Sequence, residues 1–375
     1  MRTASIRASF TELILFFLLT APFTVSQVAG SFEDVTSRAT AAREQNDVPR
    51  AIELYAQAVQ INPNWPDGWW FLGSLQYGSG SYAAARDALG HFIELTPNAG
   101  PALALRGLCE FETGEFEQSL ADIDQGIFLG AASEPRNEQI LRYHEGLLLT
   151  HLGRFDAALK AYAFFAQKGI TNPELLVAIG LAGLRMPLFP KDAPPGQQAL
   201  LTDTGNAAFE FMAGDEDKAA QAFENLFQRF PDTANAHYLY GLLLYPSDPD
   251  AAVAQFKLEV EKSAVNENAQ VMAAWALLML NNPSEALPYA RQAAKIGPSL
   301  STAQIVLGRS LIETGNLTEG IEHLERATQL EPGNLEAHLG LAKAYSNSGR
   351  REDARHEREL CLRMAKNATT QVTQP

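Results

Sequence analysis

The sequence predicts an all-α protein: a right-handed α-solenoid of about nine helix–turn–helix units arranged in two lobes. Three observations predict it: small residues recur with a period of roughly 34 residues, turn-forming residues fall midway through each period, and prolines often close it. The chain has 375 residues, of which 46% are hydrophobic and 19% charged. This composition supports a buried core and argues against a disordered chain.

Residues 1–30 have the pattern of a cleavable signal peptide. Arg2 and Arg7 precede an apolar stretch at 13–19, and small residues follow at 28–30. The alternative is an uncleaved anchor helix, although the apolar run is shorter than the ~20 residues that span a bilayer. We therefore expect export, with the mature chain periplasmic or secreted and without an integral membrane span.

The charge balance bears on the partner. Loss of residues 1–30, which contain Arg2, Arg7 and Glu12, changes the net charge from −15 to −16. An acidic chain disfavours nucleic acid as a partner. The two cysteines, Cys109 and Cys361, lie far apart in the sequence, so we expect two buried small side chains and no bridge.

Two columns of small residues define the repeat. With the unit starts given below, the eighth residue is always Gly or Ala, and the twentieth is Ala, Ser or Gly, allowing a one-residue deletion in the sixth and seventh units. Small side chains at this spacing allow two antiparallel helices to approach closely. The units start at Phe32, Pro66, Gly100, Gln139, Leu200, Ala234, Glu267, Ser301 and Leu335.

Turn and stop signals agree with this register. The fifteenth residue of each unit is Gly, Asn or Asp, the types that tolerate a left-handed backbone after a helix. Proline, which ends a helix, follows the second helix of several units. These prolines are Pro63, Pro97, Pro231, Pro298 and Pro332.

At this point the chain resembles the tetratricopeptide repeat family. Trp69-x-x-Leu72-Gly73 is similar to that family's first helix, and residues 51–63, from Ala51 through Tyr55 to Pro63, are similar to its second. The resemblance covers nearly all of residues 32–368. It implies a stack of helix pairs whose first helices line a concave face.

The pattern breaks at residues 186–196, where four prolines exclude a helix. We expect an N-terminal lobe at 31–185 with four repeats plus one unpaired helix from Pro173 to Arg185. A C-terminal lobe of five repeats should follow at 197–368, and then a disordered tail at 369–375. The strap at 186–196 is either an inert linker or a segment that packs on a lobe through Leu188 and Phe189.

The resemblance implies that partners contact the second, fifth, ninth and twelfth residues of each unit. Eight aromatic residues occupy these positions, and we expect them to line one groove that binds a polypeptide. The alternative is that the rings only fill space between stacked units. They are Trp70, Tyr77, Phe111, Tyr143, Phe211, Tyr238, Tyr245 and Trp275.

Arg309 and Lys343 share the ninth position in the last two units and form a candidate site for a carboxylate. The alternative is an exposed pair neutralised by Glu313. The Lys and Asn set with which one subfamily binds heat-shock chaperones is absent from the first three units, so that partner is not implied.

We find no catalytic motif, metal-ligand spacing or cofactor fingerprint in the sequence. His144 and His151 share a helical face but lack a third ligand at matching spacing. We therefore expect a non-catalytic scaffold that binds a partner protein or peptide without cofactor or metal. One alternative is an envelope assembly factor that binds a glycan or a lipid-linked substrate. Another is an enzyme whose active site is built across repeats.

Overall fold

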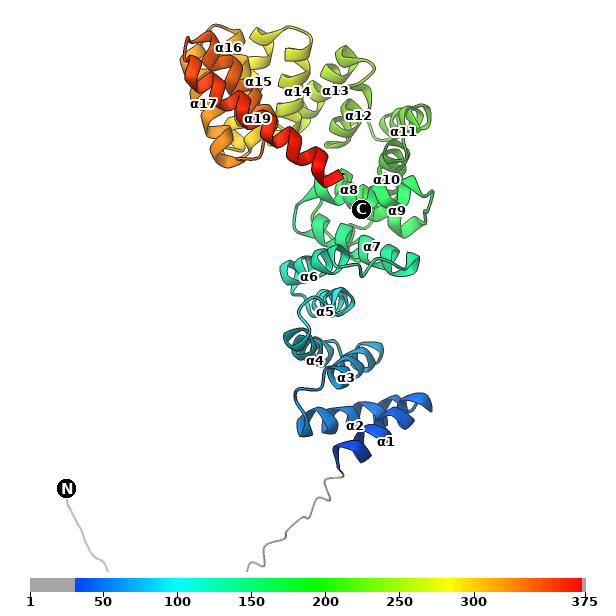
Figure 1. The fold of residues 1–375 in the computed structure, drawn as a ribbon. Coiled ribbons are helices and arrows are strands. Elements are labelled where there is room, and N and C mark those ends of the chain that lie inside the picture. Colours follow the sequence, from blue (N-terminus) through cyan, green and yellow to red (C-terminus); the bar gives the residue numbers. More distant parts are fainter. Residues whose placement is uncertain (1–30, 373–375) are drawn as a thin grey trace, which may run out of the picture.

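The computed structural model describes residues 31–372 and is all-helical over that range, which confirms the predicted fold class (Figure 1). The predicted signal peptide lies outside the described residues. The N-terminal helices are α1 (Phe32–Glu44), α2 (Val48–Ile61), α3 (Pro66–Gly78), α4 (Tyr82–Leu95), α5 (Gly100–Thr113), α6 (Phe116–Phe128), α7 (Pro135–His151), α8 (Phe155–Gln167) and α9 (Pro173–Gly183). A short 3-10 helix, η1 (Pro190–Asp192), lies in the strap.

The C-terminal helices continue the same pattern of pairs. Figure 1 shows a curved column in which each pair stacks on the one before it. The helices are α10 (Gln198–Ala213), α11 (Glu216–Arg229), α12 (Ala236–Leu244), α13 (Pro249–Lys262), α14 (Glu267–Met279), α15 (Pro283–Ile296), α16 (Ser301–Glu313), α17 (Leu317–Leu330), α18 (Leu335–Asn347) and α19 (Arg351–Val372).

The helix boundaries follow the predicted register. The first helix begins at the predicted residue in six of the nine units; the exceptions are α7, α10 and α12, which begin at Pro135, Gln198 and Ala236. Most turn residues at the fifteenth position have the expected positive φ, such as 86° at Gly114. Asp248 differs, because it caps α13 by accepting a hydrogen bond from the Ala251 amide at 3.0 Å.

The small residues hold each helix pair together as expected. A Cβ atom on Gly107 would lie 3.0 Å from the carbonyl oxygen of Ser119, and one on Gly146 would lie 2.3 Å from the Tyr162 ring. The Ser119 hydroxyl donates a hydrogen bond to the Gly107 carbonyl at 2.7 Å. Backbone contact of this kind explains why only small residues occupy both columns.

Helix α9 is not unpaired, contrary to the prediction, because α10 packs along it. A Cβ atom on Gly180 would lie 2.0 Å from the Leu201 carbonyl oxygen, and one on Gly205 would lie 1.8 Å from that of Leu176. The two glycines therefore bring the backbones of α9 and α10 into direct contact. The strap replaces the short turn that joins the other pairs.

Helix α10 thus has two partners. It is the second helix of the pair formed with α9, where it also packs against the second helix α8, and it is the first helix of the pair formed with α11. The row of second helices in the N-terminal lobe is therefore continuous with the row of first helices in the C-terminal lobe. The two rows of first helices do not form one surface.

The C-terminal end also differs from expectation. Helix α19 extends to Val372, so residues 369–372 of the expected disordered tail are helical, while 373–375 lie outside the described residues. Cys109 and Cys361 are buried and unbridged, as expected. Within residues 31–372, none of the helices combines the length and the apolar character that crossing a bilayer requires.

The contact between α9 and α10 predicts a position-specific effect of alanine. Gly180→Ala should lower the free energy of unfolding by about 1–3 kcal/mol, because the added methyl group would meet backbone. Gly90→Ala is the matched control: its Cβ meets nothing within 4 Å, so it should raise stability by about 0.5–1 kcal/mol. Urea unfolding followed by helix signal measures both, and equal stabilisation by the two changes would contradict the described contact.

Candidate functional site

The eight predicted groove aromatics lie on two surfaces rather than one. The double role of α10 places the N-terminal four and the C-terminal four on rows of helices that are not continuous. The expectation of a single aromatic groove is therefore corrected. On the N-terminal surface are Trp70, Tyr77, Phe111 and Tyr143, and on the C-terminal surface are Phe211, Tyr238, Tyr245 and Trp275.

A cavity of about 340 Å³ lies on the N-terminal surface between α3, α5 and α7, and we call it the N-terminal cavity. Trp70 and Tyr77 line it, as the sequence pattern predicts. Their rings also pack on the second helix of their own pair, with Trp70 5.6 Å from Phe92 and Tyr77 5.7 Å from Tyr82 between ring centroids. These two rings therefore fill space and face a cavity at the same time.

Phe111 is covered by the strap. The Phe189 ring lies 5.4 Å from Phe111, 5.2 Å from Phe116 and 4.4 Å from His151, on which it stacks at 9°. Phe189 is only 7% exposed. Of the two possibilities that the sequence left open, the strap packs on the N-terminal lobe, and it does so at the edge of the first-helix surface.

His144 and His151 belong to this aromatic cluster. His144 lies edge-on to Phe111 at 4.9 Å, and burial lowers its pKa, which favours the neutral ring. No group of three or more metal-ligating side chains exists within the described residues. Nearby, burial raises the pKa of the Tyr143 hydroxyl, an effect to which Glu174 adds.

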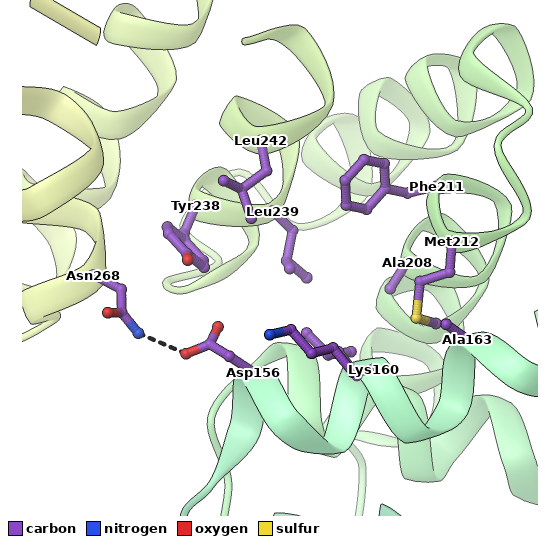
Figure 2. A pocket seen from close by; sticks show the side chains of 11 residues that line it. Asp156, Lys160, Ala163, Ala208, Phe211, Met212, Tyr238, Leu239, Leu242 and Asn268 are labelled. Atoms are coloured by element: carbon purple, nitrogen blue, oxygen red, sulfur yellow. Dashed lines mark hydrogen bonds between the residues drawn. The ribbon is translucent and has the colours of Figure 1, made fainter. Parts of the chain in front are cut away.

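A second cavity, of about 430 Å³, lies where the two lobes join (Figure 2). We call it the central cavity. It is formed by the second helix α8 together with the first helices α10, α12 and α14, and Phe211 and Tyr238 of the predicted set line it. The presence of α8 beside first helices follows directly from the double role of α10.

The edge of the central cavity is polar. Asn268 on α14 donates a hydrogen bond to the Asp156 carboxylate on α8 at 2.5 Å, and Arg185 forms an ion pair with the same carboxylate at 3.4 Å. Asp156 and Asn268 are 112 residues apart, so this hydrogen bond links the N-terminal lobe to the C-terminal lobe. Sequence reasoning missed Asp156 and Lys160, because they belong to a second helix and the family pattern directs attention to first helices.

Buried polar contacts hold α12 in place beside this cavity. The fully buried Glu259 accepts hydrogen bonds from the amides of Asn235 at 2.8 Å and Tyr238 at 3.3 Å. Burial raises the pKa of Glu259, and these bonds oppose that rise. The Asn235 side chain donates to the Leu184 carbonyl at 2.8 Å, which joins α12 to the end of α9.

The predicted basic pair is only partly available. Arg309 forms an ion pair with Glu336 at 2.8 Å and lies 4.8 Å above the Trp275 ring, so Glu336 and not Glu313 neutralises it. Lys343 is exposed and has no ion-pair partner within the part of the chain that the structure describes. Both line a cavity of about 200 Å³, to which Leu339 and Glu313 also contribute.

Comparison with known proteins agrees with this architecture. Two tetratricopeptide repeat family models match the chain. One matches residues 36–98, 72–135 and 210–247, and the other matches residues 311–357. The TPR repeat-containing protein MJ1428 of Methanocaldococcus jannaschii is 24% identical over 55% of this chain and 31% of its own length. The chain spans less than a third of each of the four curated relatives that it matches. It belongs to the tetratricopeptide repeat family.

Two solved structures are also similar to parts of the chain. The crystal structure of MamA matches at a TM-score of 0.40 and 19% identity, covering 44% of this chain and 96% of that one. The structure of YrrB, described as a TPR protein with an unusual peptide-binding site, matches at a TM-score of 0.40 and 20% identity. The match covers 44% of this chain and 84% of the YrrB chain.

The buried strap ring predicts a large effect of truncation. Phe189→Ala should lower the free energy of unfolding of the N-terminal lobe by about 3 kcal/mol, because it empties a site between Phe116 and His151. Phe128→Ala is the matched control, since Phe128 is 83% exposed and its loss should cost less than about 0.5 kcal/mol. Urea titration with circular dichroism compares the two, and a similar midpoint for both variants would rule out a packed strap.

Proposed function

We propose that this chain is a non-catalytic scaffold that binds a partner polypeptide through the N-terminal cavity. The observation that carries the proposal is the position of Trp70 and Tyr77, which line a cavity of about 340 Å³ between three successive first helices. Membership of a repeat family built from stacked helix pairs supports it, because such arrays present long binding surfaces.

The chemistry of the N-terminal cavity suits an apolar side chain of a peptide. Its walls include Ala104, Leu105, Leu108 and Ile140, while Asn137 contributes an amide. Packing already restrains the Trp70 ring against Phe92, so binding would cost little further side-chain entropy. Among the described residues the Trp70 indole N–H makes no hydrogen bond, so it is available to a peptide carbonyl.

Selection from a peptide library tests the proposal. Random peptides displayed on phage are selected on the immobilised chain, and the affinity of the enriched peptides is then measured. Trp70→Ala should lower that affinity at least about tenfold, as for a binding hot spot. Circular dichroism should show an unchanged helix content.

Trp69→Ala is the matched control for this experiment. The Trp69 ring packs on His91 at 4.4 Å and donates to the Pro63 carbonyl at 2.8 Å, away from the N-terminal cavity. Peptide affinity should survive its loss. If peptide affinity falls equally in both variants, or in neither, the proposed site is contradicted. If the chain is retained on polysaccharide beads and no peptide is enriched, the glycan-binding alternative is supported instead.

We further propose that the scaffold acts outside the cytoplasm. The support is the arrangement of Arg2, Arg7, the apolar stretch at 13–19 and the small residues at 28–30. N-terminal sequencing of the protein from the envelope or the medium should give a start within a few residues of Ser31. Recovery of an intact Met1 would overturn the cleavage.

A further inference from the structure

We propose that the central cavity is a separate binding site for a small amphipathic carboxylate, an aliphatic chain that carries one carboxylate group. This inference concerns a different surface from the N-terminal cavity. The two sites can therefore be tested separately.

The walls of the central cavity are mostly apolar. Leu159 and Ala163 come from α8, Phe211 and Met212 from α10, and Leu242 from α12. Figure 2 shows Ala163, Phe211, Met212 and Leu242 around one hollow, with the residues coming from three helices. Its volume of about 430 Å³ falls within the range of about 300–1,000 Å³ that small-molecule sites occupy.

The charged groups at its edge favour an anion. Two charged side chains line the cavity, Asp156 and Lys160. Asp156 is already bound by Arg185 and Asn268, whereas Lys160 has no ion-pair partner within residues 31–366. Glu267 also acts electrostatically on Tyr238 but does not line the cavity. Lys160 is thus the group with an unused charge, and a carboxylate is its complement.

Tyr238 supplies a polar contact of fixed position. Its amide is held by Glu259, so the side chain projects into the cavity from an anchored turn of helix. Burial raises the pKa of its hydroxyl, and Asp156 adds to the rise, so the hydroxyl stays protonated and can donate a hydrogen bond to a carboxylate. In Figure 2 the Tyr238 ring lies above the Asp156 carboxylate, and the Lys160 ammonium group lies to the right of that carboxylate.

The same edge argues for a short ligand rather than an extended polypeptide. The hydrogen bond between Asn268 and Asp156 joins α14 to α8 across one side of the hollow (Figure 2). A peptide running along the row of helices would have to break it. A compact ligand can enter beside it.

Isothermal titration with decanoate, kept below its micelle concentration, tests the proposal on the mature chain. Decanoate should bind saturably with one site per chain, and decanol, which lacks the charge, should bind more weakly. Lys160→Met keeps the aliphatic stem and should weaken decanoate binding about fivefold, the effect expected of a partly exposed charge pair. Phe211→Ala should weaken both ligands, because it removes part of the apolar wall.

Lys218→Met is the matched control. Lys218 is an exposed lysine on α11 that pairs with Asp215 and does not line the central cavity, so decanoate affinity should not change. Equal binding of decanoate and decanol, or equal affinity in Lys160→Met and wild type, would overturn the proposal. So would binding of a short peptide with a free C-terminal leucine in place of decanoate. Lys160→Met changes a surface side chain, so the test stands even where Phe211→Ala fails to fold.

Discussion

The joint between the lobes depends on the contact of two helix backbones at Gly180 and Gly205. Any Cβ atom at either position would overlap a carbonyl oxygen of the facing helix. Because these helices touch, α10 serves as second helix to α9 and as first helix to α11. The central cavity, the division of the aromatic residues and the bond between Asp156 and Asn268 all follow from that double role.

Most of the repeat could be predicted because its constraints are local. A helix crossing needs small residues at a fixed spacing, and a tight turn needs a residue with positive φ, so each unit carries its own signature in the sequence. The partner of α9 could not be predicted in this way. Gly180 and Gly205 are separated by a strap instead of a turn, and the usual spacing of the two small positions is lost.

The residues of the two proposed sites show the same limit. Trp70 and Tyr77 were predicted from their positions in one unit and do line a cavity, because adjacent first helices suffice to form it. Lys160 was missed, because a second helix borders a first-helix surface only where the lobes join. The sequence does not decide whether the strap is an inert linker or packs on a lobe through Phe189, because the contacts of Phe189 with Phe116 and His151 are long-range.

The two cavities are separate, but the two helices of one pair each line one of them. Helix α7 lines the N-terminal cavity through Asn137, Ile140 and Leu141, and its partner α8 lines the central cavity through Asp156 and Lys160. A ligand that shifts α8 therefore acts on a helix whose partner forms the other site. If the two sites are coupled, thermodynamic linkage requires the effect to be equal in both directions. Under the two proposals, α7 borders the proposed peptide site and α8 borders the proposed carboxylate site.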